Sequence, residues 1–218
     1  MRDQYQDQLA ALADALADMC LQVATAMERA TRALLEADLQ LAEQVIAEDL
    51  RIDDLRTDAE EKAYGLLALQ SPVATDLRVV IAAIHGAGDI ERMGDLALHV
   101  AQAARRRHPQ PVLPVEIAPY FAEMGRIGAA LARKAADVMR TRDVETAATL
   151  EADDDAMDDL HRHIFSLLMA PSWAYGVGPA VDITLLGRFY ERYADHAVTV
   201  ARRVVYVVTG RMPGTLAV

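Results

Sequence analysis

The sequence predicts an all-α protein, a tandem repeat of two three-helix bundles made of six long helices. The first observation is that helical periodicity of apolar residues runs through nearly the whole chain, without a convincing strand pattern. The second is composition: alanine and leucine abound while aromatic residues make up only 5%, which favours helices packed closely side by side. The third is that breaks rich in proline, glycine or acidic residues cut the chain into segments of helix length.

Each predicted helix lies between recognisable breaks. The breaks are "EAD" around Asp38, "LQSP" ending at Pro72, "RHPQPVLP" ending at Pro114, "TRD" ending at Asp143 and "APSWAYGVGP" ending at Pro179. The strongest is "RHPQPVLP", because its three prolines cannot continue a helix. The predicted helices therefore cover residues 3–35, 38–69, 73–107, 115–141, 143–169 and 179–209.

Three short segments allow two interpretations each. "RRVVYVV" at 202–208 has strand propensity, but its continuity with the preceding helical pattern favours helix. The basic run 105–107 is interpreted as the charged end of a helix, where cations favour the helix dipole, rather than as a nucleic-acid contact. Trp173 and Tyr175 belong either to a docking loop or to a packed interhelical turn, and the packed turn is favoured.

Two short sequence motifs each occur twice in the chain, which indicates an internal duplication. "IDDL" at 52–55 matches "MDDL" at 157–160 with an offset of 105, and "ERMGD" at 91–95 matches "ERYAD" at 191–195 with an offset of 100. The difference of five residues is expected in a hairpin connection, where insertions are tolerated. We predict two bundles, in a first half (residues 1–109) and a second half (residues 110–218).

Composition excludes several classes of protein. The chain has 218 residues and a net charge of −11, so a nucleic-acid-binding role has no electrostatic support. Cys20 is the single cysteine, so an internal disulfide is impossible, which fits a reducing cytoplasm. There is no signal-peptide pattern and no run of about 18 uninterrupted apolar residues. We expect a soluble cytoplasmic protein without direct membrane insertion.

Motifs of enzyme chemistry are missing from the sequence. It has no glycine-rich phosphate loop, no HExxH or cysteine-based metal motif, and no serine nucleophile in a recognisable turn. A ferritin-like di-metal oxidase would need Glu-x-x-His motifs from two helices, and only Asp158 with His161 approximates one. We expect no enzymatic activity, with a di-metal carboxylate enzyme and a metal-free structural protein as the alternatives.

The repeated phrases place acidic pairs on helix faces. Residues four apart share one face of a helix, so the Glu and Asp of each "Glu-Arg-x-x-Asp" phrase point the same way. The second helix of each half carries a comparable Asp pair, chosen by alignment of the halves. The candidate site residues are Asp49, Asp53, Glu91 and Asp95 in the first half, and Asp154, Asp158, Glu191 and Asp195 in the second.

These acids require a positive partner. Ile84, Ala87 and Leu98 share the face of Glu91, so the pair lies in an apolar stripe where uncompensated charge is costly. One candidate is arginine; the other is a bound metal, because carboxylate oxygens are hard ligands suited to magnesium, manganese, calcium or iron. Both stay open, and the nearby histidines are left outside the ligand set. The arginine candidates are Arg78, Arg92, Arg188 and Arg192, and the histidines are His85, His99, His161 and His196.

Two long segments carry a family resemblance. "SPVATDLRVVIAAIHGAGDIERMGDLALHVA" at 71–101 resembles the third helix of the PhoU family, the accessory regulators of bacterial phosphate uptake. "LLGRFYERYADHAVTVA" at 185–201 is similar to the same element in the second repeat of that family. The resemblance covers essentially the whole chain. It departs at Tyr193 and Ala194, where the family prefers an aliphatic residue and glycine, and at 181–183, which lacks the Asp-Leu-Arg triplet.

The resemblance implies a fold, partners and a cofactor. Family members have two three-helix bundles in tandem and are cytoplasmic, reaching the inner membrane through their partners. The implied role is a negative regulator that acts on the phosphate ABC transporter and on a sensor histidine kinase. A homodimer is expected separately, because a three-helix unit leaves an apolar face unused. The implied cofactor is metal, with iron, zinc, manganese or magnesium as candidates. Carried over, the family's metal motifs fall on the candidate acids defined above.

Overall fold

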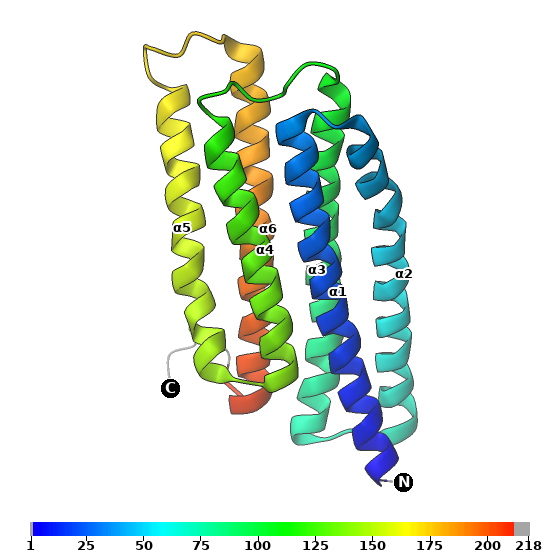
Figure 1. Ribbon diagram of the computed structural model, residues 1–218. Helices are drawn as coiled ribbons and strands as arrows, with labels where there is room; N and C mark the ends of the chain where they lie inside the picture. Colours follow the sequence, from blue (N-terminus) through cyan, green and yellow to red (C-terminus); the bar gives the residue numbers. More distant parts are fainter. Residues whose placement is uncertain (1, 212–218) are drawn as a thin grey trace.

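The computed structural model describes residues 2–211 and shows six helices joined by short connections (Figure 1). No strand occurs within residues 2–211, so the predicted fold class is confirmed. The helices are α1 (Arg2–Glu36), α2 (Leu39–Gln70), α3 (Ala74–Arg107), α4 (Ala118–Thr141), α5 (Val144–Leu168) and α6 (Val177–Thr209).

Two helix starts differ from the predicted bounds by more than one residue. Helix α4 begins at Ala118 rather than 115, because the backbone N–H groups of Ile117 and Ala118 both donate to the Pro114 carbonyl and close a turn. Helix α6 begins at Val177 rather than 179. Pro179 lies in the first turn of that helix, where a proline removes no intrahelical hydrogen bond.

Two of the predicted breaks are helix caps. The Asp38 carboxylate accepts a hydrogen bond from the backbone N–H of Leu41 (2.9 Å) and begins α2. Asp143 accepts from the N–H groups of Glu145 (3.0 Å) and Thr146 (3.3 Å) and begins α5. These bonds satisfy donors that a helix start leaves free, which explains why an acidic residue marks both breaks.

Of the three segments that allowed two interpretations, two are helical and the third is a packed turn. Residues 202–208 continue α6, and the basic run 105–107 forms the last turn of α3. The Trp173 indole N–H donates to the Gly176 carbonyl (2.8 Å), and its ring packs against Tyr175 and the hydrophobic core. The predictions of helix, helix end and packed interhelical turn are therefore confirmed.

Each half of the chain forms one bundle, and the bundles lie side by side. Helices α1–α3 make the first and α4–α6 the second, and the halves meet where α1 packs on α4 and α3 packs on α6 (Figure 1). Both of these pairs run antiparallel, so the second bundle is turned over relative to the first. One continuous hydrophobic core extends through both bundles.

A buried hydrogen bond connects the halves within this core. The hydroxyls of Thr31 on α1 and Tyr190 on α6 lie 2.8 Å apart, and Phe121 of α4 packs edge-on against the Tyr190 ring at 5.5 Å. Helix α4 comes close to Thr31 at Gly125, where an added Cβ would lie only 2.5 Å from the Thr31 hydroxyl oxygen. Glycine is therefore required sterically at position 125.

A half-buried ion-pair cluster links α3 and α6 across the same interface. Asp89 accepts a hydrogen bond from Arg203 Nε (2.7 Å) and lies 3.2 Å from His196 Nδ1. These partners hold the pKa of Asp89 below its usual value against the opposing effect of burial. The repeat of Asp89 is Phe189, whose ring packs on His99 at 5.2 Å, so an aromatic contact replaces the ion pair there.

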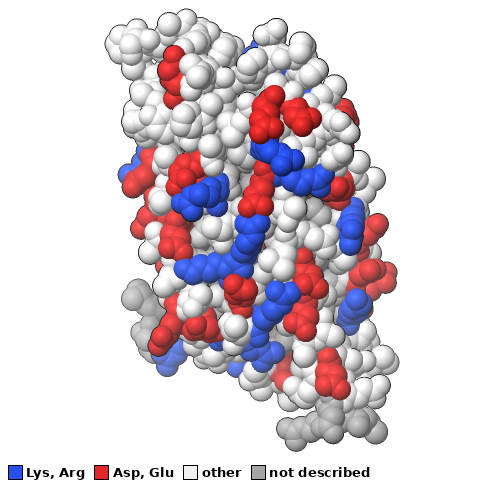
Figure 2. Space-filling view, viewed as in Figure 1, with Lys and Arg blue, Asp and Glu red and all other residues white. Residues whose placement is uncertain are grey.

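Salt bridges cover the seam between α1 and α4. Arg133 donates to Glu28 (2.6 Å), and Arg140 donates to Asp18 (2.5 Å). Figure 2 shows that acidic and basic side chains alternate over the middle of this face instead of forming a patch of one sign. The end near the α5–α6 connection is mostly uncharged.

Helix α1 is long and apolar enough to cross a membrane by length and composition alone, over Gln4–Glu36. Its position accounts for that composition, because the helix lies between α2, α3 and α4 and buries residues such as Leu12, Val23 and Met27 in the core. A core helix passes the same test as a membrane span, so its apolar character is explained by packing within the bundle.

Substitution of Gly125 tests the close approach of α4 to α1. We expect Gly125→Ala to lower the free energy of unfolding by about 1–3 kcal/mol, because Thr31 is buried and cannot move aside freely. Gly65→Ala in α2 is the control, with no heavy atom within 4 Å of its added Cβ. It is expected to raise stability by about 0.5–1 kcal/mol. Urea unfolding measures both, and an unchanged stability for Gly125→Ala would contradict the packing argument.

Candidate functional site

The four candidate acids of the first half lie together where α2 packs on α3. Asp49 is half-buried, and its pKa is raised to about 6, first by burial and then by repulsion from Asp53, Asp95 and Glu91. Mutual repulsion of this kind requires the carboxylates to be close neighbours. The structure therefore brings together the acids that the repeated phrases selected.

The second half repeats this arrangement between α5 and α6. The pKa of Asp154 is raised to about 7 by burial and then by repulsion from Asp195, Asp158 and Glu191. The exposed Asp155 adds a smaller repulsion. Burial also raises the pKa of Glu191. We call the four acids of each half its acid cluster.

Small residues allow the helices to approach at each cluster. A Cβ added to Gly94 would lie 3.1 Å from Ile52 and 3.4 Å from Asp49 Oδ1, so α2 and α3 touch at this glycine. The second half has Ala194, which is fully buried. The bulky Tyr193 beside it is also fully buried and packs against Gly128 of α4. The departures from the family pattern are thus accommodated by the packing.

Arginines neutralise part of the first cluster. Arg92 donates to Asp95 (2.9 Å), as its position in the motif suggested, and its Nε lies 3.7 Å from Glu91 Oε2. Arg56 was not among the predicted partners, and it donates to Glu91 Oε1 (3.0 Å) and to Glu60 (3.0 Å).

The other three arginine candidates differ in the groups that they contact. Arg188 binds Glu191 in the second cluster, as expected. Arg78 was a wrong candidate, because it donates to the Val207 carbonyl near the end of α6 (3.3 Å) instead of to an acid. Arg192 is exposed and forms no ion pair with any residue in the described range 2–211. The clusters therefore retain more carboxylates than arginines.

One carboxylate oxygen shows this incomplete neutralisation directly. Glu91 Oε2 is buried and has no hydrogen-bond partner among the described residues. A buried carboxylate oxygen that accepts no hydrogen bond, beside Asp49 and 3.7 Å from Arg92 Nε, fits the chemistry of a cation site, since hard cations prefer such oxygens. In the conformation described, no three His, Cys, Asp or Glu side chains of residues 2–211 converge as metal ligands, so chelation here would require side-chain rotation.

The histidines differ in their relation to the clusters. His161 lies against α6, where a Cβ added to Gly187 would be 3.1 Å from its ring, one helical turn before Glu191. His85 is exposed on α3, while His99 and His196 belong to the contact between α3 and α6. His161 is thus the histidine that adjoins an acid cluster.

The offset of 105 also relates two ion pairs that were not predicted from the sequence. Arg29 of α1 binds Glu48 of α2, and Lys134 of α4 binds Asp153 of α5 (2.5 Å). Each acid immediately precedes the half-buried Asp of its cluster. These pairs hold the first helix of each half to the second, and they could have been found by extending the repeat alignment to the flanking charges.

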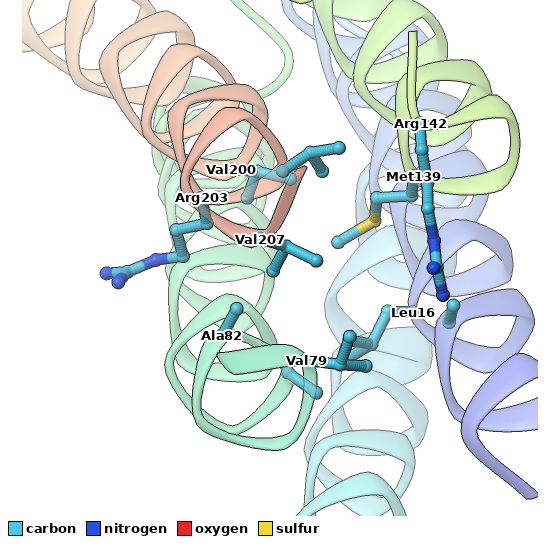
Figure 3. Close-up of a pocket in the computed structure, with 11 residues that line it drawn as sticks. Leu16, Val79, Ala82, Met139, Arg142, Val200, Arg203 and Val207 are labelled. Carbon is cyan, nitrogen blue, oxygen red and sulfur yellow. The ribbon is translucent and has the colours of Figure 1, made fainter. Parts of the chain in front are cut away.

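The cavity between the two halves is too small to be a substrate site. A cavity of about 50 Å³ lies where α1, α3, α4 and α6 meet and is lined mainly by Leu16, Val79, Met139 and Val207 (Figure 3). In Figure 3, Arg203 points away from this cavity. It is far smaller than the roughly 300–1,000 Å³ typical of small-molecule pockets, so it is a packing gap between the halves.

The raised pKa of Asp154 predicts how stability depends on pH without metal. The folded state keeps the proton of Asp154 up to about pH 7, whereas the unfolded chain loses it near pH 4. The contribution of this proton to folding stability is therefore full below about pH 4 and is lost as pH rises to about 7. In chelator-treated protein we expect Asp154→Asn to raise the unfolding free energy at pH 8 by at most about 1 kcal/mol, after screening by solvent. The gain should vanish near pH 4.

Asp155→Asn is the matched control for this measurement, because it removes the same charge at an adjacent exposed position. Its effect on thermal unfolding at pH 8 should be smaller than that of Asp154→Asn. Equal effects of the two substitutions, or a gain that does not depend on pH, would show that Asp154 does not experience the repulsion described.

Comparison with known proteins identifies the family of the chain. The PhoU domain model matches residues 16–104 and 121–204, once in each half. "Phosphate-specific transport system accessory protein PhoU homolog 2" of Mycobacterium tuberculosis is 57% identical, over 98% of this chain and 100% of the relative. "PhoU homolog 1" of Mycobacterium leprae is also 57% identical, over 98% of this chain and 96% of the relative.

Solved structures agree with this assignment. PhoU from Pseudomonas aeruginosa superposes with a TM-score of 0.82 at 26% identity, over 95% of this chain and 100% of that one. The phosphate transport system regulatory protein PhoU from Streptococcus pneumoniae has the same fold, with a TM-score of 0.86 at 23% identity over 97% of this chain and 100% of that one. The chain belongs to the PhoU family.

Proposed function

We propose that this chain is a regulatory accessory protein of phosphate uptake, a negative regulator of the phosphate ABC transporter and of phosphate-starvation two-component signalling. The observation that carries the proposal is the end-to-end match, at 57% identity, to accessory proteins of phosphate-specific transport systems. The protein acts by occupying surfaces of the transporter and of its sensor histidine kinase, on the cytoplasmic side of the membrane.

The relatives support a role without catalysis. They are named accessory proteins of transport, and none of the names describes an enzyme. A di-metal oxidase of the ferritin type would require a Glu-x-x-His motif on two helices. Here Asp158 and His161 approximate that motif once, and the equivalent pair in the first half is Asp53 and Arg56.

Exposed apolar side chains support a role in protein contacts. At the start of α3, Val73, Leu77 and Ile81 are 74%, 39% and 38% exposed and follow each other at intervals of four residues. At the start of α6, a second such series lies over Val177, Val181 and Leu185. Exposed apolar residues grouped on one helix face are common where proteins meet. We assign contacts with transport partners, or with a second copy in a homodimer, to such surfaces.

We further propose that the acid clusters hold metal ions. The support is the gathering of four carboxylates in each half and the buried Glu91 Oε2, which accepts no hydrogen bond. Iron, zinc, manganese and magnesium all accept carboxylate oxygens. A bound cation would supply the positive charge that relieves the repulsion, and Asp49 and Asp154, each facing three other acids, would gain most. The metal would serve structure and regulation rather than turnover.

Complementation tests the regulatory role. A bacterial strain that lacks its own PhoU protein is expected to express phosphate-starvation genes and accumulate phosphate in rich medium. Expression of this chain should lower both, measured with a starvation-gene reporter and a phosphate assay, with the empty vector as control. If immunoblots show normal protein levels while both readouts stay high, the chain does not have this role in that strain.

Elemental analysis tests the metal sites. Protein purified without chelator is expected to contain metal, and Glu91→Ala/Asp95→Ala should lose the share held by the first cluster. Glu123→Ala/Arg126→Ala, which removes an exposed ion pair of α4, is the control and should retain the metal of the wild type. Absence of metal from the wild type after incubation with iron, manganese, zinc and magnesium would refute the metal proposal and leave the regulatory proposal standing.

A further inference from the structure

The end of the second bundle that carries the α5–α6 connection is covered by exposed apolar side chains. The α3–α4 connection lies at the same end (Figure 1), and the surface near the α5–α6 connection is mostly uncharged (Figure 2). Single exposed apolar residues are normal on soluble proteins, but a group of this size marks a contact surface. We call this surface the apolar end. Its members, which are 44% to 79% exposed, are Val115, Phe165, Met169, Tyr175, Val177 and Val181.

A packed turn displays these side chains. The Tyr175 hydroxyl donates to Glu116 (2.6 Å), so the α5–α6 connection is tied to the segment that leads into α4. The Trp173 ring packs against Tyr175 and the hydrophobic core, and its indole N–H is already bonded to Gly176. The apolar end therefore needs little ordering when it meets a partner, which lowers the entropic cost of binding.

Arginines border the apolar end. Residues 105–107 end α3 beside the start of α6, where Arg107 binds Asp182. Arg106 is exposed and forms no ion pair with any residue in the described range 2–211. Together with Arg107 it lines a hollow beside Val112. At least one cation at this end is thus free to bind an anion from outside the chain.

The charge at this end differs from that of the whole chain. The segments 103–120 and 162–185, which form the end, carry four arginines and two acids, although the net charge of the chain is −11. The equivalent segments of the first half, 57–85 and 203–211, carry four basic and four acidic residues. Their apolar series lies at the opposite end of the molecule (Figure 1). The duplicated surface has therefore become cationic in the second half alone.

These features favour a lipid surface as the partner. Tryptophan and tyrosine prefer the headgroup level of a bilayer, where an apolar ring and a polar tip are both accommodated. Exposed apolar side chains enter the acyl boundary, and arginines attract anionic headgroups. The acidic remainder of the chain opposes this attraction little, because charges more than about 8 Å away are largely screened at physiological salt. A second copy docked through the same end would instead place arginines against arginines.

We propose that the apolar end of the second bundle binds the surface of a membrane that contains anionic lipids, with a lipid phosphate in the hollow beside Arg106 and Arg107. The bundle stands on this end, and no helix enters the bilayer. The inference rests on the proposed function, since an accessory protein of transport works beside a membrane. It also narrows the assignment of contact surfaces: the apolar series on α6 faces lipid, and the series on α3 remains for protein partners.

Vesicle binding tests the inference with a reporter that the chain already contains. Trp173 is the only tryptophan, so its fluorescence reports on this end alone. With vesicles of phosphatidylglycerol and phosphatidylcholine in equal parts, we expect the protein to co-sediment and the Trp173 emission to shift to shorter wavelength. Vesicles of phosphatidylcholine alone should bind at least about 5-fold more weakly, the factor that one arginine contributes near an anionic surface. Absence of binding, or binding without a shift, would overturn the inference.

Paired substitutions locate the contact. Val177→Ser/Val181→Ser should weaken vesicle binding at least about 10-fold, because it removes apolar surface from the contact. Leu77→Ser/Ile81→Ser, at the equivalent positions of the first half, is the matched control and should bind as the wild type does. Circular dichroism checks that both variants keep their helices. Equal losses in the two variants would overturn the assignment to the second half.

The role of the free arginine is tested in the same assay. Arg106→Gln should weaken binding to vesicles with phosphatidylglycerol about 5-fold and leave binding to phosphatidylcholine alone unchanged. Arg192→Gln is the control, because Arg192 is also exposed, forms no ion pair among the described residues and lies midway along α6. Equal effects of the two substitutions would show that total charge, rather than the hollow, decides binding, and would overturn the assignment of Arg106.

Complementation separates this inference from the proposed function. If Val177→Ser/Val181→Ser abolishes regulation in cells while the wild type binds no vesicles, the apolar end contacts a protein; the lipid inference is then overturned and the regulatory proposal stands. If the wild type binds vesicles as described but does not complement, the lipid contact stands and the regulatory proposal is overturned.

Discussion

Repulsion between carboxylates held on an interhelical face is the constraint on which the rest of this structure depends. Asp49 and Asp154 each lie half-buried among three further acids, so their charged forms lack both full hydration and full pairing. Such an arrangement survives only if surrounding packing holds the helices in place. Gly94, Ala194 and the ion pairs between the first and second helices of each half provide that packing.

Duplication explains why the constraint occurs twice, and divergence explains why the halves are not identical. Asp89 forms an ion pair across the interface, whereas its repeat Phe189 packs on a histidine ring. Arg56 binds a cluster acid, whereas its repeat His161 offers an imidazole. In both cases the two residues occupy equivalent backbone positions but differ in their side chains. The two halves therefore differ in which charged groups pair with one another.

The sequence predicted the parts of this protein that follow from local periodicity. Helix bounds follow from apolar spacing and from the Asp38 and Asp143 caps, and the acids were found because a spacing of four fixes a common face. The partners of the acids were harder to predict, because a long arginine side chain can reach several helices. Arg78 bonds a backbone carbonyl of α6, and Arg56 crosses from α2 to Glu91. Only extension of the repeat alignment to Arg56 and His161 would have revealed their equivalence.

The acid clusters and the contact between the halves are built on the same helices. On α6, Tyr190 bonds Thr31 of α1 while the next residue, Glu191, belongs to a cluster, and Asp195 precedes the interface residue His196. On α3, Asp89 at the interface lies two residues before Glu91. Because a packed helix moves as a unit, a side-chain rearrangement that draws a cluster together acts on the helix that also joins the halves. The proposed cation sites and the contact between the two bundles therefore share two helices, so binding of a cation would act on helices that also join the halves.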